Sequence, residues 1–174
     1  MDGSRCVDRY YIKGEVSYIK YGDWLYAPRE PSIFEKPRII YQLIRNISLK
    51  RRIVATYLDI KLYSDRNTGL IFVKQNIKLD IKYILGILNS NLLNYIHAKS
   101  HNSTYISFPS IESLPFAIAE PSVQQKIVTL VDYILLARRA NPQVDTSALE
   151  REIDQLVYQL YGLTEEEIKI VEGR

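Results

Sequence analysis

The sequence is poor in the residues that build the commonest metal sites. Its 174 residues include two histidines and one cysteine. The chain therefore cannot form an internal disulfide, and it has too few Cys and His residues for a four-ligand Cys/His zinc site. The lone Cys6 fits a reducing compartment, which favours the cytoplasm. His97 and His101 have a metal-compatible helical spacing, but no third ligand is evident nearby. We therefore expect no metal in this chain.

Glycine-rich loops and long apolar runs are also missing. Neither G-x-G-x-x-G nor G-x-x-x-x-G-K occurs, and there is no G-x-S-x-G, which argues against nucleotide-binding loops and a serine-hydrolase turn. Because no run of eighteen apolar residues exists, we expect no membrane span, and the polar start MDGSRCVDRYY is unlike a signal peptide. The composition, 47% hydrophobic and 25% charged, is ordinary for one globular domain with or without a helical extension.

Positive and negative charges are unevenly distributed along the chain. Residues 145–174 hold three basic and eight acidic side chains, a balance of −5, so residues 1–144 carry +8. The densest positive stretch, EKPRIIYQLIRNISLKRR, has six basic residues and one acid. This asymmetry favours a body that binds a polyanion, with an acidic tail that has another role. The alternative is that the charges are scattered in this way without functional meaning.

A small β-sheet is predicted for the first half of the chain. Residues 10–35 mix tyrosine with Gly, Pro and charges and suggest short strands and turns. Three β-branched stretches, residues 36–45, 52–59 and 70–75, read as strands. Residues 64–69, SDRNTG, have the composition of a turn between the last two.

A broken helix follows the predicted strands. Apolar residues from Ile81 to Leu88 recur at the i, i+3, i+4, i+7 spacing of one helical face, and Asp80 is a plausible N-cap. Asn89 can end this helix, and Ser90 or Asn91 can begin a second one. Asn89 and Ser90 are therefore interpreted as boundaries between two helices and not as residues of a binding site.

The last third of the chain predicts helices after an extended stretch at 106–121, which contains three prolines. Ser122 and Gln125 form a possible capping box for a long helix. The break at ANPQVDT, residues 140–146, separates it from a second helix, so the two should pair as an antiparallel hairpin.

Two further signals end this helical region. Gly162 ends the second helix, and Thr164 with Glu167 forms a capping box for a short third one. The predicted fold class is mixed α+β, with a small mixed sheet, a broken central helix and a C-terminal helical hairpin. We expect a recognition domain at residues 1–120 and a helical segment at 121–174 that packs on it or on a partner.

Candidate catalytic residues are few. Two D-I-K tripeptides, Asp59–Lys61 and Asp80–Lys82, match half of a metal-dependent nuclease site, but such a site needs another carboxylate to share the metal. The first lies at a strand end and the second at a helix start, where capping accounts for the aspartate. We assign no catalytic residue, and a nuclease built on Asp59 and Lys61 remains an alternative.

Polar and basic side chains instead cluster at the ends of the predicted strands and after the broken helix. Arg and Lys suit guanine or phosphate, and Asn and Gln suit adenine, so such loops are a reasonable DNA-binding platform. Each could equally be an ordinary polar loop residue. The candidate DNA-binding residues are Arg45, Asn46, Lys50, Arg51, Arg52, Arg66, Asn67, Lys74, Gln75, His97, Lys99, His101, Asn102 and Tyr105.

The order of these elements resembles a known family. IFEKPRIIYQLIRN, VATYLDIKLYSDRNTGLIFVK, KYILGILNSNLLNYI and FPSIESLPFAIAE, followed by QQKIVTLVDYILLAR, are similar to the TaqI-like C-terminal specificity domain. That domain is the target-recognition part of adenine-specific DNA methyltransferases and of fused type IIG restriction–modification enzymes. It is also similar to the recognition domains of type I specificity subunits. The tail LEREIDQLVYQLYGLTEEEIKIVEG resembles the helical C-terminus of these enzymes, so the resemblance covers most of the chain.

The resemblance implies a division of labour. In such enzymes a separate domain binds S-adenosylmethionine and flips the adenine beside an Asn/Asp-Pro-Pro-aromatic motif. In this chain Asn141 and Pro142 are followed by Gln143, so the motif is not present. The resemblance therefore implies that this chain holds no cofactor. S-adenosylmethionine and Mg²⁺ would belong to catalytic domains elsewhere.

Three functions follow from these observations. The first is sequence-specific recognition of double-stranded DNA for a methyltransferase or endonuclease domain, present in cis or in trans. The second is a helical assembly module that binds no nucleic acid, and the third is the metal-dependent nuclease. No membrane partner is expected, and a homodimer is possible.

Overall fold

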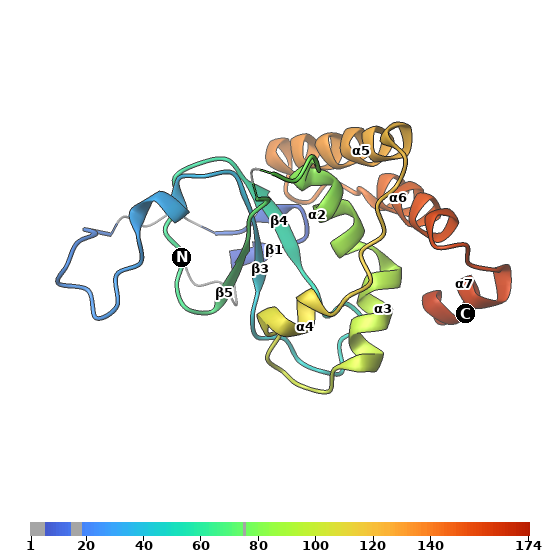
Figure 1. Ribbon diagram of the computed structural model, residues 1–174, viewed down its shortest axis with the longest axis horizontal. Helices are drawn as coiled ribbons and strands as arrows, with labels where there is room; N and C mark the ends of the chain where they lie inside the picture. The colour runs from blue at the N-terminus through green and yellow to red at the C-terminus, as the bar shows by residue number, and fades with distance from the viewer. Residues whose placement is uncertain (1–5, 15–18, 75) are drawn as a thin grey trace.

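A computed structural model of the chain describes residues 6–14, 19–74 and 76–174 (Figure 1). The strands are β1 (Val7–Asp8), β2 (Tyr11–Ile12), β3 (Arg38–Gln42), β4 (Ala55–Leu58) and β5 (Thr68–Ile71), and the 3-10 helix η1 (Pro31–Phe34) lies between β2 and β3. The helices that follow are α2 (Ile81–Asn89), α3 (Asn91–Ser100), α4 (Phe108–Glu112), α5 (Pro121–Ala140), α6 (Ser147–Leu160) and α7 (Glu165–Glu172). This arrangement confirms the predicted α+β class. Within the described residues, no helix is both long enough and apolar enough to cross a membrane.

The central sheet has the strand order β4-β3-β5. It differs from the mixed sheet expected from the sequence, because β3 pairs antiparallel with both neighbours, and the β1–β2 pair is antiparallel as well. Along β3, Ile39 and Tyr41 pack in the main core, while Ile40 packs with Val7 on the opposite face. This alternation follows from the two-residue period of a strand and gives the sheet two covered faces.

The strand predicted at residues 70–75 begins two residues earlier and ends at Ile71. A tight turn causes the shift. The Asp65 carboxylate accepts the backbone N–H of Asn67 at 3.0 Å, and Thr68 Oγ1 donates to the Asp65 carbonyl at 2.7 Å. Because this Asx turn is complete by Asn67, Thr68 can already pair with Gln42 in β3.

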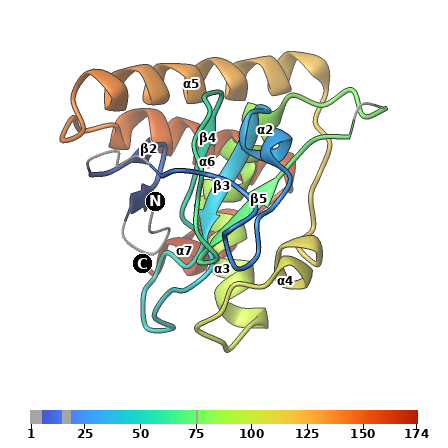
Figure 2. The ribbon, with the colours of Figure 1, turned by 90° about the vertical axis from the view of Figure 1, so that its left-hand side faces the viewer.

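The helices cover one side of the sheet (Figure 1). α2 packs on β4 and β3, α5 lies across α2, and α6 lies beside α5. Figure 2 shows α5 running across one end of the sheet, with α6 below it. Gly86 in α2 permits the close approach of α5, since a Cβ at this position would lie 2.6 Å from a methyl carbon of Ile127.

The predicted break in the central helix is confirmed. α2 ends at Asn89, and the Ser90 hydroxyl accepts the N–H of Leu93 at 3.3 Å as the N-cap of α3. Asp80 caps α2 as expected, with its carboxylate accepting the N–H of Lys82 at 2.7 Å. The chain therefore changes direction at Ser90 without leaving helix termini unsatisfied.

Two predictions near α5 were wrong. Residues 106–121 were expected to be extended, but Phe108–Glu112 form a short helix because Ser107 caps it by accepting the N–H of Ser110 at 3.2 Å. The Ser122–Gln125 capping box is not formed. α5 begins two residues earlier than this capping box predicts, with Glu120 as the N-cap and Pro121 in its first turn, where a missing N–H costs nothing.

The predicted hairpin and the two signals that follow it are confirmed. α5 and α6 run in opposite directions as a hairpin across the break at 141–146 (Figure 1). Gly162 has a φ of +66° just after α6, and Thr164 and Glu167 form the capping box of α7. Apolar residues of α5 and α6 belong to the same core cluster as those of β3 and α2, so the segment 121–174 packs directly on the rest of the chain.

Candidate nucleic-acid interface

Three loops meet at one end of the central sheet, which we call the loop end. It consists of residues 43–54 after β3, 64–67 before β5 and 101–107 after α3. The N–H of Leu43 donates to the Asn67 carbonyl at 3.0 Å, and the N–H of Arg45 donates to the Thr104 carbonyl at 2.9 Å. A bridge between Ile44 and Tyr105 adds to this contact. The structure thus brings together segments whose paired residues, Ile44 and Tyr105, are 61 positions apart in sequence.

Apart from Lys50, which is described below, five of the candidate residues have exposed side chains at the loop end or beside it, namely Asn46, Arg66, Lys99, Asn102 and Tyr105. Asn46 is held by an Asx turn, in which its Oδ1 accepts the N–H of Ser48 at 2.9 Å. The ammonium of Lys99 lies 5.6 Å from the ring centre of Tyr95. Together these residues offer amide, cationic and aromatic groups to a partner that approaches this end.

Two other candidates, Arg45 and Arg52, point inward. Arg45 donates from Nη2 to the Arg51 carbonyl at 2.9 Å, and Arg52 donates from Nη2 to the Ser103 carbonyl. Burial lowers the pKa of both guanidinium groups. Arg52 is 1% exposed, so it ties two loops of the loop end together and does not face solvent.

His97 is fully buried and supports the same region. Its Nε2 lies 3.2 Å from Ser110 Oγ, which itself donates to the Ser107 carbonyl at 2.7 Å. Since that hydroxyl proton is already used, the Nε2–H tautomer of His97 is the donor. Burial, then His101 and Arg52, lowers the pKa of His97 to about 4. The ring stacks on His101, with a centroid distance of 4.8 Å.

Lys50 and Arg51 face the C-terminal helices. Lys50 Nζ donates to the Glu172 carbonyl in the last turn of α7, where a cation is favoured by the helix dipole. Arg51 is partly buried near Arg9 and Asp154, and burial followed by the Arg9 charge lowers its pKa.

The other candidates lie in three places. Asn67 lies within the loop end, where its amide donates to the Asp65 carboxylate at 3.3 Å, and His101 caps α3 beside it. Lys74 is exposed, but it follows β5 toward the opposite end of the sheet. Gln75 lies outside the described residues.

The first D-I-K tripeptide, Asp59–Lys61, does not form a metal site with other described residues. Asp59 lies 3.9 Å from Arg139, while Lys61 pairs with Glu35 at 2.7 Å. Within residues 6–14, 19–74 and 76–174, no three His, Cys, Asp or Glu side chains are grouped so that they could hold a metal ion.

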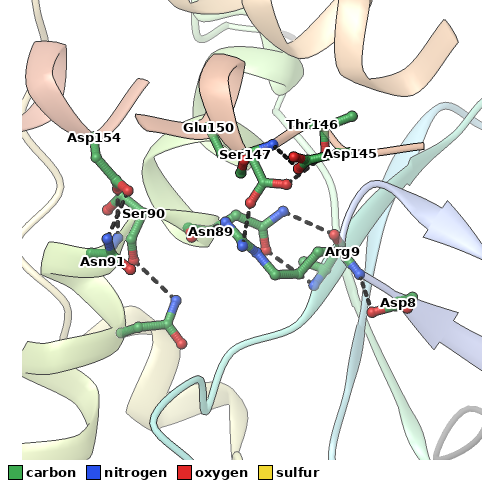
Figure 3. Close-up of polar contacts among 12 residues, drawn as sticks. Asp8, Arg9, Asn89, Ser90, Asn91, Asp145, Thr146, Ser147, Glu150 and Asp154 are labelled. Atoms are coloured by element: carbon green, nitrogen blue, oxygen red, sulfur yellow. Dashed lines mark hydrogen bonds and ion pairs between the residues drawn. The ribbon is translucent and has the colours of Figure 1, made fainter. Parts of the chain in front are cut away.

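The sequence reading missed the role of the asparagines in the helix break (Figure 3). Asn89 is fully buried, and its amide both accepts from and donates to the Ala55 backbone, at 3.2 and 3.0 Å. Asn94 accepts the N–H of Ile53 at 2.8 Å. The break therefore fastens α2 and α3 to strand β4 and to the segment that precedes it. The only signal in the sequence was the unusual polarity of this helix.

A buried polar cluster extends from the same break to α6 (Figure 3). Asp154 accepts the N–H and the side-chain amide of Asn91 at 2.7 and 2.8 Å. Arg9 pairs with Glu150 and donates to the Asn89 carbonyl at 2.9 Å. Burial raises the pKa of Asp154 to about 6, although the Asn91 hydrogen bond and the charges of Arg9 and Arg51 act in the opposite direction.

Comparison with known proteins agrees with the resemblance seen in the sequence. A family model described as the TaqI-like C-terminal specificity domain matches residues 1–115, which include the loop end and stop before α5. A protein of Methanocaldococcus jannaschii, described as a candidate type II restriction enzyme and methyltransferase, is 27% identical over 139 residues. The match covers 75% of this chain but only 12% of that protein, so the chain spans a small part of its relative.

Proposed function

Because the chain belongs to the family of TaqI-like C-terminal specificity domains, we propose that it is the DNA target-recognition module of a restriction–modification system. The observation that carries this proposal is the loop end. Three separate loops are hydrogen-bonded to one another there and expose amide, cationic and aromatic side chains together. A rigid frame with exposed polar loops is a common way to present recognition residues.

The exposed side chains divide naturally into two roles. Arg66 and Lys99 hold phosphates, which supply affinity but no sequence information. Asn102 reaches a base edge, since an amide can form a bidentate pair with adenine, whereas Asn46, whose Oδ1 already accepts from Ser48, offers only its Nδ2–H donors. Arg45, Arg52 and His97, although candidates by residue type, hold the loops in place from inside.

The chemistry belongs to other domains in this proposal. A methyltransferase or endonuclease domain, in cis or in trans, binds S-adenosylmethionine and Mg²⁺, and this chain positions duplex DNA for it. The description of the archaeal relative, which is much longer than this chain, supports such an arrangement.

The proposal is tested by selecting binders from a pool of randomised DNA duplexes with the purified chain. We expect a short common sequence to be enriched, and the affinity for it to fall steeply with salt as counterions are released. Asn102→Ala should relax the preference at one position, while Lys99→Ala should weaken all duplexes alike and reduce the salt slope by about one.

Arg151→Ala provides the control, since Arg151 is exposed on α6, away from the loop end. Its affinity should match that of the unmodified chain. A selection that enriches no sequence, with binding that does not respond to salt, would contradict the proposal.

A further inference from the structure

A second aromatic and cationic surface lies beside the loop end. The segment 19–30, between β2 and η1, forms no helix or strand and projects from the face of the sheet opposite to α2 and α3 (Figure 1). Trp24 is 63% exposed, and Tyr26 is fully exposed. The ammonium of Lys20 lies 5.2 Å from the centre of a Trp24 ring. Ile19 on the same segment is 55% exposed, so three large apolar side chains are exposed within eight residues, and such a cluster is typical of an interaction site.

The base of this segment is anchored to the body by aromatic packing. The Tyr21 ring stacks on Tyr63 with a centroid distance of 4.3 Å, and Phe34 lies 4.9 Å from Tyr63. The Tyr21 hydroxyl donates to the Arg29 carbonyl, which closes the segment on itself. Trp24 and Tyr26 are therefore presented from a fixed base.

A cleft of about 1220 Å³ separates this segment from residues 61–67. Arg29 and Arg66 line it together with Lys13 and Lys61. The two lysines are paired, with Asp8 and with Glu35, at 2.7 Å in each case. Among the residues that the structure describes, no acidic side chain forms an ion pair with Arg29 or Arg66, so these two guanidinium groups are the cations left for an anionic occupant.

The cleft is continuous with the loop end. Arg66 lines the cleft, and its neighbour Asn67 accepts the N–H of Leu43 within the loop end. The cleft is also larger than the roughly 300–1,000 Å³ that small-molecule sites occupy. An extended polyanion that already lies on the loop end is therefore a better occupant than a free small molecule.

We propose that the segment 19–30 is a second DNA-contacting arm, which holds the same duplex across this cleft. Arg29 and Arg66 bind phosphates, and Trp24 and Tyr26 pack on sugars or exposed base surfaces. Aromatic and arginine side chains are a common combination for such contacts. The inference rests on the proposed function, because it assumes that the loop end receives DNA.

Trp24 is the only tryptophan of the chain, so its fluorescence reports on this segment alone. The full chain is titrated with a fluorescently labelled 30-base-pair duplex of mixed sequence at low salt. Anisotropy of the label measures binding, and the emission and iodide quenching of Trp24 are recorded in a parallel titration with unlabelled duplex. We expect the emission to change along the same curve as the anisotropy, and the quenching by iodide to fall in the complex.

Substitutions give an independent readout. Tyr26→Ala and Arg29→Ala should each weaken duplex binding by about tenfold, the size of one lost contact of about 1.4 kcal/mol. Tyr133→Ala and Arg151→Ala are the matched controls, because both residues are exposed on helices and neither lines the cleft. Circular dichroism of each variant confirms that it folds.

The outcomes separate the two proposals. In one outcome the duplex binds, Trp24 emission stays unchanged, and Tyr26→Ala and Arg29→Ala bind like their controls. The proposal of a second arm is then wrong, while the proposed recognition function is unaffected. If neither the mixed-sequence duplex nor the randomised pool binds at any salt concentration, both proposals fail.

Discussion

The side-chain amide of Asn89 forms two hydrogen bonds with the backbone of Ala55. Its Oδ1 accepts the Ala55 N–H at 3.2 Å, and its Nδ2 donates to the Ala55 carbonyl at 3.0 Å. β4 is an edge strand of the sheet, so one residue at the end of α2 takes the place of a neighbouring strand. The polar residue in an apolar helix thus covers this sheet edge, together with the Tyr10 N–H, which donates to the same carbonyl at 3.0 Å.

Replacing this amide should therefore be costly. We expect Asn89→Leu to lower the free energy of unfolding by about 1–3 kcal/mol, because the buried Ala55 N–H is left without a partner, while the Ala55 carbonyl keeps the N–H of Tyr10. Urea unfolding followed by circular dichroism measures the change. Asn102→Ala, at an exposed position, should stay within about 0.5 kcal/mol of the original chain. Equal stability of the two variants would show that the Asn89 amide contributes nothing.

Acid should destabilise the protein through His97. The pKa of this histidine is lowered from 6.5 to about 4, so between these pH values the unfolded chain binds a proton that the folded chain does not. The contribution of the neutral His97 ring to stability is fully present above pH 6.5. It is lost as the pH falls toward 4, by about 3 kcal/mol at most.

His97→Gln should remove this part of the acid sensitivity, and glutamine can still donate a hydrogen bond toward Ser110. Urea unfolding of both proteins between pH 4 and 7 measures the difference. Nuclear magnetic resonance of the His97 ring should show the neutral Nε2–H tautomer at pH 6. A positively charged ring at that pH would contradict the prediction.

Asp154 should make stability depend on pH in the opposite direction to His97. Its pKa is raised from 3.8 to about 6, so in this window the folded chain holds a proton that the unfolded chain has released. This carboxyl therefore contributes stability below pH 4 that is lost as the pH rises to 6, on the order of 3 kcal/mol. The stability of Asp154→Asn relative to the original chain should rise over the same range. A difference that is flat with pH would show that Asp154 titrates normally.

Substitutions of Arg52 and of Lys99 should affect stability and DNA binding separately. Arg52→Ala removes a buried guanidinium that ties loop 43–54 to Ser103, so we expect a stability loss of about 2–3 kcal/mol. Lys99→Ala at an exposed position should leave stability within about 0.5 kcal/mol and weaken DNA binding. Thermal unfolding and duplex anisotropy of both variants test this. Unchanged stability of Arg52→Ala would argue that Arg52 is free to contact DNA.

Local signals in the sequence were enough for the strands at 36–45 and 52–59 and for the break at Ser90. Strand composition and capping act over a few residues, so one stretch of sequence contains the information. The inward positions of Arg52 and His97 could not be predicted in this way. Each is set by a partner elsewhere in the chain, at Ser103 and Ser110, and residue type alone does not tell which way a polar side chain points.

The buried position of Asp154 could not be predicted from the sequence either. In the sequence it is one of several acids on α6 and reads as a solvated helix residue. In the fold it is buried against the first turn of α3, and its partner Asn91 lies 63 positions earlier. The aromatic segment around Trp24 was recognised only as irregular, because its exposure depends on how the body of the protein leaves it uncovered.

The polar cluster around the helix break limits where two homologous chains can be recombined. A crossover between two homologous genes at residue 120 would place Arg9 and Asn91 in one parent and Glu150 and Asp154 in the other. A chimera made in this way keeps its buried charges matched only if both parents carry the same partners. An exchange limited to the three loops of the loop end leaves all four residues in their original setting. New DNA specificities should therefore arise more readily by loop replacement than by swapping halves of the chain.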